Sequence, residues 1–517
     1  MGQNLNHDDP KGSDHKSSDQ KSYDLIVIGG GINGTGIAAD AAGRGLKVLL
    51  CEQDDLASAT SSASSKLIHG GLRYLEQYEF RLVREALAER EVLLRKAPHI
   101  IKPLRFRLPH QPHLRPAWML RAGLFLYDHL SQRTTLKGSH GIRFDQQSPL
   151  VSEITKGFEY SDAWVEDARL VVLNAMDARE HGATIKTRTR CIKAERMDDQ
   201  WQVTLQDQFS NQQSSFTCKA LVNASGPWVN QVFDQALELT TPNKIRLVRG
   251  SHIIVPKLHY QPEAYILQNT DNRIVFVIPF EQDFSLVGTT DIEHKDSLKQ
   301  VHISKEEKSY LIDVANSYFT RKLDTSDIIH SYSGVRPLLD DEADNPQAIT
   351  RDYTLELEGS ESTPPLLSVY GGKITTYRKL AEAAVNRLSP FFTDMDSPWT
   401  ATSPLPGGDF ESRPVLEKEL SAQYPWLSES LCIRLVRSYG TFSQQILNGA
   451  EKLEDLGEQI GADLYAREVE YLMKQEWACT AEDILWRRSK LGLRFTEQEK
   501  QNLDGLIDSL NHRSKAA

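Results

Sequence analysis

The segment between residues 25 and 52 most strongly constrains the fold, because it has the order strand, glycine turn, helix, strand. The apolar run 25–28 is followed by G-G-G-I-N-G-T-G, and Glu52 ends a second apolar run 23 residues beyond Gly29. In such a segment Gly29 allows a tight turn, Gly31 lets the backbone approach a pyrophosphate, and Gly34 brings helix against strand. The amides at the helix start face the phosphates, and Glu52 can bind a ribose hydroxyl. The segment therefore predicts an adenine dinucleotide cofactor.

Composition excludes several classes of function. With 517 residues the chain has room for about three domains. Its net charge of −11 argues against a nucleic-acid-binding protein. The five cysteines lie far apart with no C-x-x-C pair, so we expect no zinc or iron–sulfur site and a reducing compartment. The polar N-terminus and the lack of an apolar run of ~18 to 20 residues favour a cytoplasmic protein without a signal peptide or transmembrane helix.

The sequence divides into four predicted parts. Residues 1–22 are polar and aperiodic, which indicates a disordered tail. Residues 23–396 are predicted to form an α/β nucleotide-binding domain with a β-rich substrate domain inserted at about 91–150 and 244–335. A linker rich in Pro and Gly, 397–410, leads to an all-α domain at 411–517. Helical periodicity is clear at 80–96, 429–439 and 466–476.

Two more predicted strands end in turns of small residues. Residues 221–224 are followed by S-G-P-W, and residues 366–370 by G-G-K-I-T, where a helix begins near Thr375. Such turns usually lie where the carboxyl ends of parallel strands meet a ligand. We therefore expect Gly226, Gly372 and Thr375 beside the cofactor.

Five stretches together resemble one family. They are residues 28–45, 61–75, 333–338, 349–353 and 371–381, and the resemblance extends from about Tyr23 to about Arg494. The family is that of the FAD-dependent sn-glycerol-3-phosphate dehydrogenases, and the bacterial aerobic respiratory type is especially similar. The resemblance implies a glutathione-reductase-like, Rossmann-type domain that binds FAD non-covalently, with the substrate domain resting on its sheet.

The resemblance also implies a reaction, a cellular location and an oligomeric state. Glycerol 3-phosphate is oxidised to dihydroxyacetone phosphate, a hydride passes from C2 to N5 of FAD, and the electrons continue to a membrane quinone. Family members are peripheral proteins on the inner face of the cell membrane and are often homodimers. The motifs and the resemblance together place FAD against Gly29, Gly31, Asn33, Gly34, Glu52, Ser64, Gly226, Gly372 and Thr375.

Cations at predicted strand edges and glycine turns indicate a site for a doubly charged phosphate. Arginine binds phosphate with a bidentate fork, and lysine supplies a compact charge. The resemblance assigns Arg351, Arg73 and Tyr74 to the phosphate end, with His252 beside them. For each cation alone, a surface or ion-pair role remains an alternative.

The alcohol end of the substrate requires a group that takes the hydroxyl proton. Histidine has a suitable pKa, so His69 and His252 are both candidates, and the choice between them stays open. Arg336 and Lys373 are expected to contact substrate and to stabilise the developing alkoxide and the reduced flavin. A hydrogen bond from histidine to backbone is the alternative for either ring.

A stretch without acidic residues lies between Glu91 and Asp128. It combines seven cations with apolar and aromatic residues, which suits a surface of anionic lipid headgroups. The alternative is a basic surface that faces a subunit or the cofactor. The cations are Arg95, Lys96, Lys102, Arg105, Arg107, Arg115 and Arg121, and the apolar residues include Leu104, Phe106, Leu108, Trp118, Met119 and Phe125.

Three other functions fit parts of the sequence. An oxidase of the same fold would pass electrons to oxygen, and the basic apolar stretch favours quinone over it. A non-catalytic FAD-binding scaffold would not need the clustered cations and histidines. The anaerobic type of dehydrogenase would need iron–sulfur cysteines, which the spacing of the cysteines disfavours.

Overall fold

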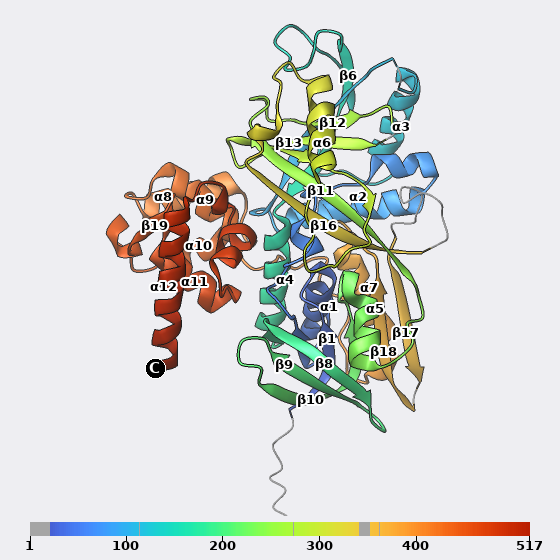
Figure 1. Ribbon diagram of the computed structural model, residues 1–517, viewed down its shortest axis with the longest axis vertical. Helices are drawn as coiled ribbons and strands as arrows, with labels where there is room; N and C mark the ends of the chain where they lie inside the picture. The colour runs from blue at the N-terminus through green and yellow to red at the C-terminus, as the bar shows by residue number, and fades with distance from the viewer. Residues whose placement is uncertain (1–20, 113, 272, 341–351, 361, 517) are drawn as a thin grey trace, which may run out of the picture.

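The computed structural model describes residues 21–112, 114–271, 273–340, 352–360 and 362–516, apart from the side chains of Arg73, Gln77 and 513–516. Figure 1 shows an α/β part that contains β1 (Ser22–Ile28), a second sheet above it, and C-terminal helices to one side. The predicted tail, except for its last two residues, and Arg351 lie outside the described residues.

The first sheet carries the glycine motif. Its other strands and the helices that cover it are β2 (Val48–Cys51), β7 (Thr184–Lys186), β8 (Thr189–Arg196), β9 (Trp201–Asp207), β10 (Gln213–Asn223), β17 (Thr354–Ser360), β18 (Thr363–Tyr370), α1 (Ile32–Gly43), α4 (Asp167–Glu180), α5 (Val229–Val232) and α7 (Tyr377–Leu388). The order is β17–β18–β10–β1–β2–β7, with parallel pairing from β18 to β7. Helix α1 packs against α4 and α7 on one face. The carboxyl ends of β18, β10, β1 and β2 therefore meet at one edge.

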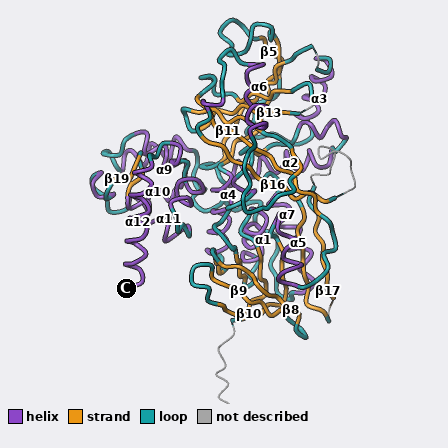
Figure 2. The backbone as a smooth tube through the Cα atoms, viewed as in Figure 1, coloured by secondary structure: helices purple, strands orange, loops and turns teal. Residues whose placement is uncertain are grey.

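The second sheet is mostly antiparallel. Its strands and helices are β3 (Leu67–Ile68), β4 (Ile101–Pro109), β5 (His140–Arg143), β6 (Lys156–Val165), β11 (Ile245–Pro256), β12 (Ala264–Gln268), β13 (Ile274–Phe280), β14 (Phe284–Gly288), β15 (Ile292–Glu293), β16 (His330–Leu339), α2 (Phe80–Lys96), α3 (Ala117–His129) and α6 (Lys305–Tyr318). Helix α6 packs on one face of this sheet, and α2 and α3 pack on the other. Figure 2 shows strands β11, β13 and β16 above strands β8, β9 and β10 of the first sheet.

The second sheet is larger than the two predicted inserts at 91–150 and 244–335. Strand β3 precedes the first insert, β6 follows it, and β16 continues beyond the second. The physical reason is strand pairing, because β6 pairs with every residue of β4 and β16 pairs with β11 over most of its length. Such partners are distant in sequence and leave no local signal at the boundary.

Helix α1 lies unusually close to the strand that precedes it. Gly29 has φ +115°, a conformation that glycine adopts without steric cost. A Cβ at Gly34 would overlap the carbonyl oxygen of Gly29. The absence of a side chain at Gly34 thus lets the first turn of α1 rest on the end of β1, as the glycine motif predicts.

The C-terminal part has its own apolar core. It contains α8 (Arg413–Gln423), α9 (Glu429–Tyr439), α10 (Ser443–Leu447), α11 (Ala466–Glu476), the π-helical turn η9 (Asp483–Arg488), α12 (Glu497–Ala516) and a hairpin of β19 (Gln459–Gly461) and β20 (Leu464–Tyr465). The part is helical as expected, with this hairpin as an addition. The segment 397–410 packs on the first sheet's helices, where Trp399 Nε1 donates to Asp40 O and Leu405 joins the core.

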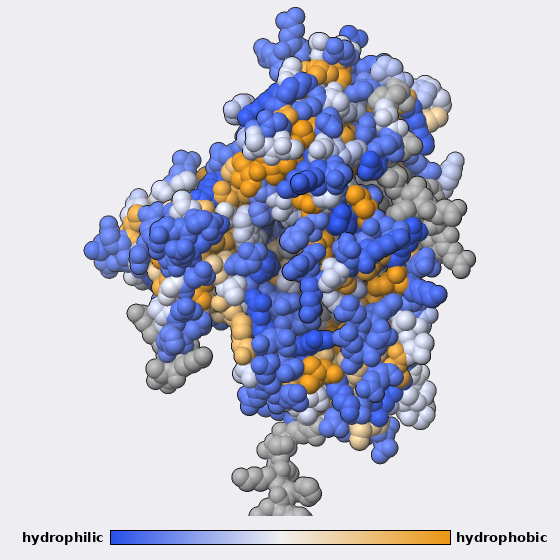
Figure 3. All heavy atoms as spheres, viewed as in Figure 1, coloured by the Kyte–Doolittle hydropathy of each residue, from blue (hydrophilic) through white to orange (hydrophobic). Residues whose placement is uncertain are grey.

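The face of the molecule in Figure 3 is largely hydrophilic, with apolar side chains in small groups. Among the described residues, no helix has both the length and the apolar character needed to cross a membrane.

The close approach at Gly34 predicts a sharp stability difference between two glycine variants. Gly34→Ala should destabilise the protein by about 1–3 kcal/mol, the usual cost of overpacking, because α1 must move away from β1. Gly123→Ala in α3 is the matched control, since a Cβ there meets nothing within 4 Å and alanine favours helix. Urea unfolding of both FAD-saturated variants measures this difference. Equal midpoints for Gly34→Ala and the parent would contradict the packing account.

Candidate active site

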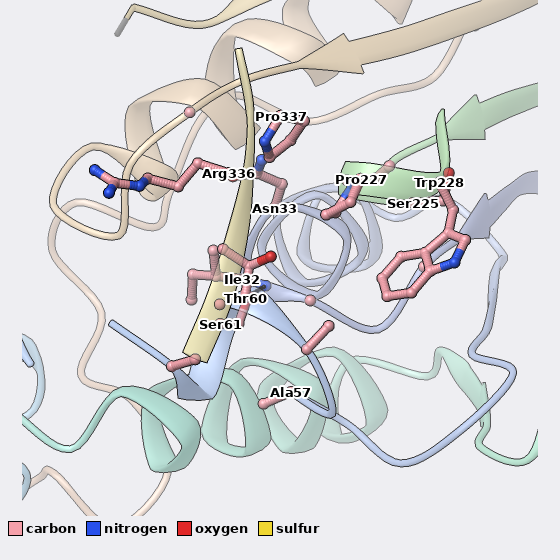
Figure 4. A pocket seen from close by; sticks show the side chains of 18 of the residues that line it. Ile32, Asn33, Ala57, Thr60, Ser61, Ser225, Pro227, Trp228, Arg336 and Pro337 are labelled. Atoms are coloured by element: carbon pink, nitrogen blue, oxygen red, sulfur yellow. Dashed lines mark hydrogen bonds between the residues drawn. The ribbon is translucent and has the colours of Figure 1, made fainter. Parts of the chain in front are cut away.

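The main pocket lies between the two sheets. Its walls come from the turns after β1, β2, β10 and β18, from the loop 57–65, and from β11 and β16. Figure 4 shows Asn33 at the start of α1, Ser225 and Trp228 in the turn after β10, and Arg336 on β16 around this space. The arrangement brings most of the predicted nucleotide and substrate residues to a single pocket.

Glu52 sits at the end of β2 with its carboxylate held by two backbone amides. Its Oε2 accepts from Gly30 N at 2.6 Å, and its Oε1 accepts from Asp54 N at 2.8 Å. Burial raises the pKa of Glu52 to about 7, although these two hydrogen bonds lower it. Each carboxylate oxygen keeps a second lone pair, so the fixed group can still accept a hydrogen bond from a ribose hydroxyl.

The start of α1 fits a pyrophosphate. Gly31 precedes an uncharged first turn, and a Cβ at Gly31 would project to 3.1 Å from Ser61 Oγ. Asn33 Nδ2 donates to Gly371 O at 3.1 Å, while Asn33 Oδ1 is buried in the pocket wall without a hydrogen-bond partner among the described residues. A buried oxygen of this kind calls for a donor, which the hydroxyl groups of a bound dinucleotide supply.

Glycine turns and hydroxyl groups form further parts of the pocket wall. A Cβ at Gly226 would meet nothing within 4 Å, so this part of the wall is open to a ligand. Thr375 Oγ1 accepts from His69 N at 3.2 Å, which joins the loop after β3 to the turn after β18. Gly372 lies in that same turn. Ser64 also lines the pocket, but its hydroxyl donates to Asp167 Oδ2 at 2.7 Å and therefore anchors the loop.

Three predicted substrate residues, Tyr74, Arg336 and Lys373, line the pocket from different elements. Arg336 forms an ion pair with Asp291, and its Nη2 lies 3.4 Å from Thr290 O. Lys373 Nζ lies 3.9 Å from the centroid of the Tyr74 ring, which is a cation–π distance. Arg336 keeps part of its side chain exposed, whereas Lys373 Nζ is buried against the Tyr74 ring.

His252 is held rigidly and is neutral at physiological pH. Its Nε2 lies 2.9 Å from Ser65 Oγ, and its ring stacks on Tyr332 at 4.9 Å. Burial, together with the nearby charges of Lys66 and Arg336, lowers the pKa of His252 to about 3. His69 lies in a different environment from His252. It is half-buried and lines both the main pocket and a second cavity.

The second cavity adjoins the main pocket at His69, Tyr74 and Thr289. Apolar side chains from β4, α3 and β13 form much of its lining; they include Leu108, Leu120, Leu124, Ile274 and Phe276. The sequence does not predict this cavity, because its lining comes from strands that pair over long distances in the second sheet. It does not predict the places of Ser65 and Thr289 in the main pocket either. The run of small, mostly polar residues 58–65 was the available signal for the loop beside the cofactor.

Not every predicted site residue faces the pocket. Gly34 lies beneath the pocket wall and acts through helix packing. The side chain of Arg73 and the whole of Arg351 lie outside the described residues, so their phosphate assignment remains an expectation from the sequence.

The predicted lipid-facing stretch is only partly at the surface, which corrects the sequence-based expectation. Strand β4 lies inside the second sheet, where Leu104, Phe106 and Leu108 are buried in the core. Arg105 and Arg107 both pair with Glu159 of β6. The exposed part is α3, on which Trp118 and Phe125 are 70% and 57% exposed.

Comparisons with known proteins agree with this geometry. Residues 24–378 match the family of FAD dependent oxidoreductases, and residues 398–515 match the C-terminal domain of alpha-glycerophosphate oxidase. The chain is 59% identical over 488 residues to a glycerol-3-phosphate dehydrogenase of Pseudomonas aeruginosa, covering 94% of this chain and 95% of that protein. It is 56% identical over 499 residues to the aerobic glycerol-3-phosphate dehydrogenase of Escherichia coli, covering 96% and 100%.

A solved structure extends the similarity to the whole fold. The glycerol-3-phosphate dehydrogenase of Bacillus halodurans, crystallised with FAD, is 25% identical, with a TM-score of 0.72 over 95% of each chain. The chain therefore belongs to the family of FAD-dependent glycerol-3-phosphate dehydrogenases, and FAD is its cofactor.

Proposed function

We propose that this protein oxidises sn-glycerol 3-phosphate to dihydroxyacetone phosphate, with FAD bound non-covalently in the main pocket. The observation that carries this proposal is the shared pocket, whose lining includes both Glu52 and the start of α1 and the cations Arg336 and Lys373. Clustered cations in a chain of net charge −11 suit an anionic substrate rather than an uncharged polyol.

The substrate would lie with its phosphate toward Arg73, Tyr74 and Arg351 and its secondary alcohol toward Arg336 and Lys373. Arg336 is held by Asp291, so its guanidinium is oriented before substrate arrives. Preorganised positive charge stabilises a developing alkoxide without further reorganisation. When bound, FAD supplies the acceptor for the hydride that leaves C2.

We assign the proton of the C2 hydroxyl to His69. His69 lines both cavities, which gives the proton a route away from the site. His252 is fully buried beside two cations, and its low pKa makes it a weak base. Its contacts with Ser65 and Tyr332 suit a group that positions the substrate.

The division between the two histidines predicts different kinetic effects. His69→Gln should lower the rate constant of flavin reduction at saturating glycerol 3-phosphate by about 10²–10⁴-fold, the usual contribution of a general base. His252→Gln should raise the apparent dissociation constant more than it lowers this rate constant. Anaerobic stopped-flow absorbance measures both quantities, and the exposed His140→Gln serves as control. A larger rate loss in His252→Gln than in His69→Gln would reverse the assignment.

We further propose a membrane quinone as the electron acceptor, reached from the inner face of the cell membrane. The apolar second cavity joins the main pocket at His69 and is lined in part by α3. The exposed aromatic residues Trp118 and Phe125 lie on this helix, and Tyr78, in the turn before α2, is 80% exposed. Arg121 on α3 and Arg115 just before it add positive charge that suits anionic headgroups, and Arg115 also pairs with Glu76 at 3.3 Å.

This account predicts that apolar contacts of α3 hold the protein on anionic vesicles. The double variant Trp118→Ser, Phe125→Ser should bind phosphatidylglycerol vesicles at least tenfold more weakly, because each ring contributes about 1.5–3 kcal/mol when buried. Phe209→Ser is the matched control, since Phe209 is 67% exposed at the far end of the first sheet. Vesicle sedimentation measures binding. Flavin reduction by substrate should not change in either variant, and unaltered vesicle binding by the α3 variant would contradict the docking account.

Molecular oxygen is a second candidate acceptor. It is favoured by the similarity of residues 398–515 to the C-terminal domain of alpha-glycerophosphate oxidase. Mixing the substrate-reduced protein with a short-chain quinone or with air-saturated buffer separates the two. Faster reoxidation by air than by quinone would establish an oxidase.

A further inference from the structure

The helical C-terminal part reaches the cofactor loop through one buried carboxylate. Asp55 lies three residues after Glu52, and both Asp55 and Arg488 of η9 are completely buried. Arg488 Nη1 and Nη2 donate to Asp55 Oδ2 and Oδ1, each at 2.7 Å, and Arg487 Nε donates to Oδ2 at 2.6 Å. Two guanidinium groups that are more than 400 residues away in sequence thus bind a single carboxylate.

The loop that contains Asp55 forms part of the wall of the main pocket, with Gln53 before Asp55 and Ala57 after it. Ala57 N donates to Gly30 O at 3.1 Å, and Ser61 Oγ accepts from Ile32 N at 3.0 Å. The loop is therefore attached to the glycine turn at one point and to the first turn of α1 at another. Movement of Asp55 would move both Glu52 and the residues that line the pocket after it.

A second contact fixes η9 on the other side of this loop. Asp483 accepts from Arg188 Nη2 at 2.7 and 2.9 Å, and Arg188 N in turn donates to Asp54 O at 2.8 Å. Although burial raises the pKa of Asp483, the charges of Arg487 and Arg188 lower it to about 2, so the group is ionised at neutral pH.

Arg488 also has acceptors within the C-terminal part. Its Nη2 and Nε donate to Glu476 O, at 2.6 and 3.1 Å, at the end of α11. The guanidinium is therefore fixed in the C-terminal part before it meets Asp55. Removing one partner from such a buried set leaves an uncompensated charge, which is costly.

We propose that the C-terminal part positions the FAD-binding loop, with Arg487 and Arg488 as positioning residues that act through Asp55 on Glu52. The inference rests on the proposed place of FAD in the main pocket. It gives the C-terminal part a role in cofactor retention, separate from any role in holding the second sheet.

The structure supplies a control interface for this proposal. Arg437 of α9 binds Glu281 at 2.7 Å in the turn between β13 and β14, which lies outside the main pocket. Both Arg437 and Arg487 form ion pairs between the C-terminal part and the rest of the chain. Only the pair made by Arg487 involves the FAD-binding loop.

The test compares FAD release from the holoprotein in the variants Arg487→Gln, Asp55→Asn and Arg437→Gln. We expect Arg487→Gln and Asp55→Asn each to raise the FAD dissociation constant at least tenfold, measured by ultrafiltration, with faster recovery of flavin fluorescence after dilution. Arg437→Gln should remain within twofold of the parent. Because Arg487 acts through Asp55, the double variant should release FAD no faster than Asp55→Asn alone.

Further measurements separate positioning from general stability. Arg487→Lys, which keeps the charge, should retain part of the FAD affinity. The same measurement can be made on Arg487→Lys if Arg487→Gln does not fold. With saturating FAD, reduction of the flavin by glycerol 3-phosphate should stay within twofold of the parent. The proposal is overturned if Arg487→Gln retains FAD like the parent, or if Arg437→Gln loses FAD equally. Failure of glycerol 3-phosphate to reduce the flavin in every variant would refute the proposed substrate and leave the FAD measurements valid.

Discussion

The rest of the structure depends on the contact between Gly34 and the carbonyl of Gly29, where the first turn of α1 rests on the end of β1. This contact fixes the position of the first turn of α1, whose amides form part of the pocket wall. The ends of β10 and β18 join the same edge because their strands pair in parallel with β1 or with each other. A cofactor bound at this edge contacts backbone from several segments distant in sequence, so its site is stable only when the whole sheet is formed.

The second sheet adds the side chains proposed to contact substrate to the nucleotide site of the first sheet. Its strands β11 and β16 carry His252 and Arg336 to the pocket that the first sheet opens. Two fixed environments result, because burial keeps His252 neutral while Arg336 stays charged beside Asp291. Neutral and charged groups at one end of a pocket suit a substrate that has a phosphate and an alcohol to be oxidised.

Local patterns allowed much of the fold to be predicted. Helices α2, α9 and α11 have the predicted bounds, because their apolar periodicity is strong and signals such as the Ser428 cap on Leu431 N lie nearby in sequence. Features that depend on distant partners were not predictable. The alternating cations of β4 suggested a lipid surface, but Arg105 and Arg107 form ion pairs with Glu159 of β6, and Arg107 also pairs with Glu263. The contact between Asp55 and Arg488 spans 433 residues and leaves no local pattern.

The central claim is that the pocket between the two sheets directs oxidation to C2 of glycerol 3-phosphate. Anaerobic titration of the FAD-loaded protein with sn-glycerol 3-phosphate, followed by analysis of the product, tests this claim directly. The account predicts bleaching of the flavin with one dihydroxyacetone phosphate formed per flavin reduced. A flavin that stays oxidised, or glyceraldehyde 3-phosphate formed by oxidation at C1, would contradict it.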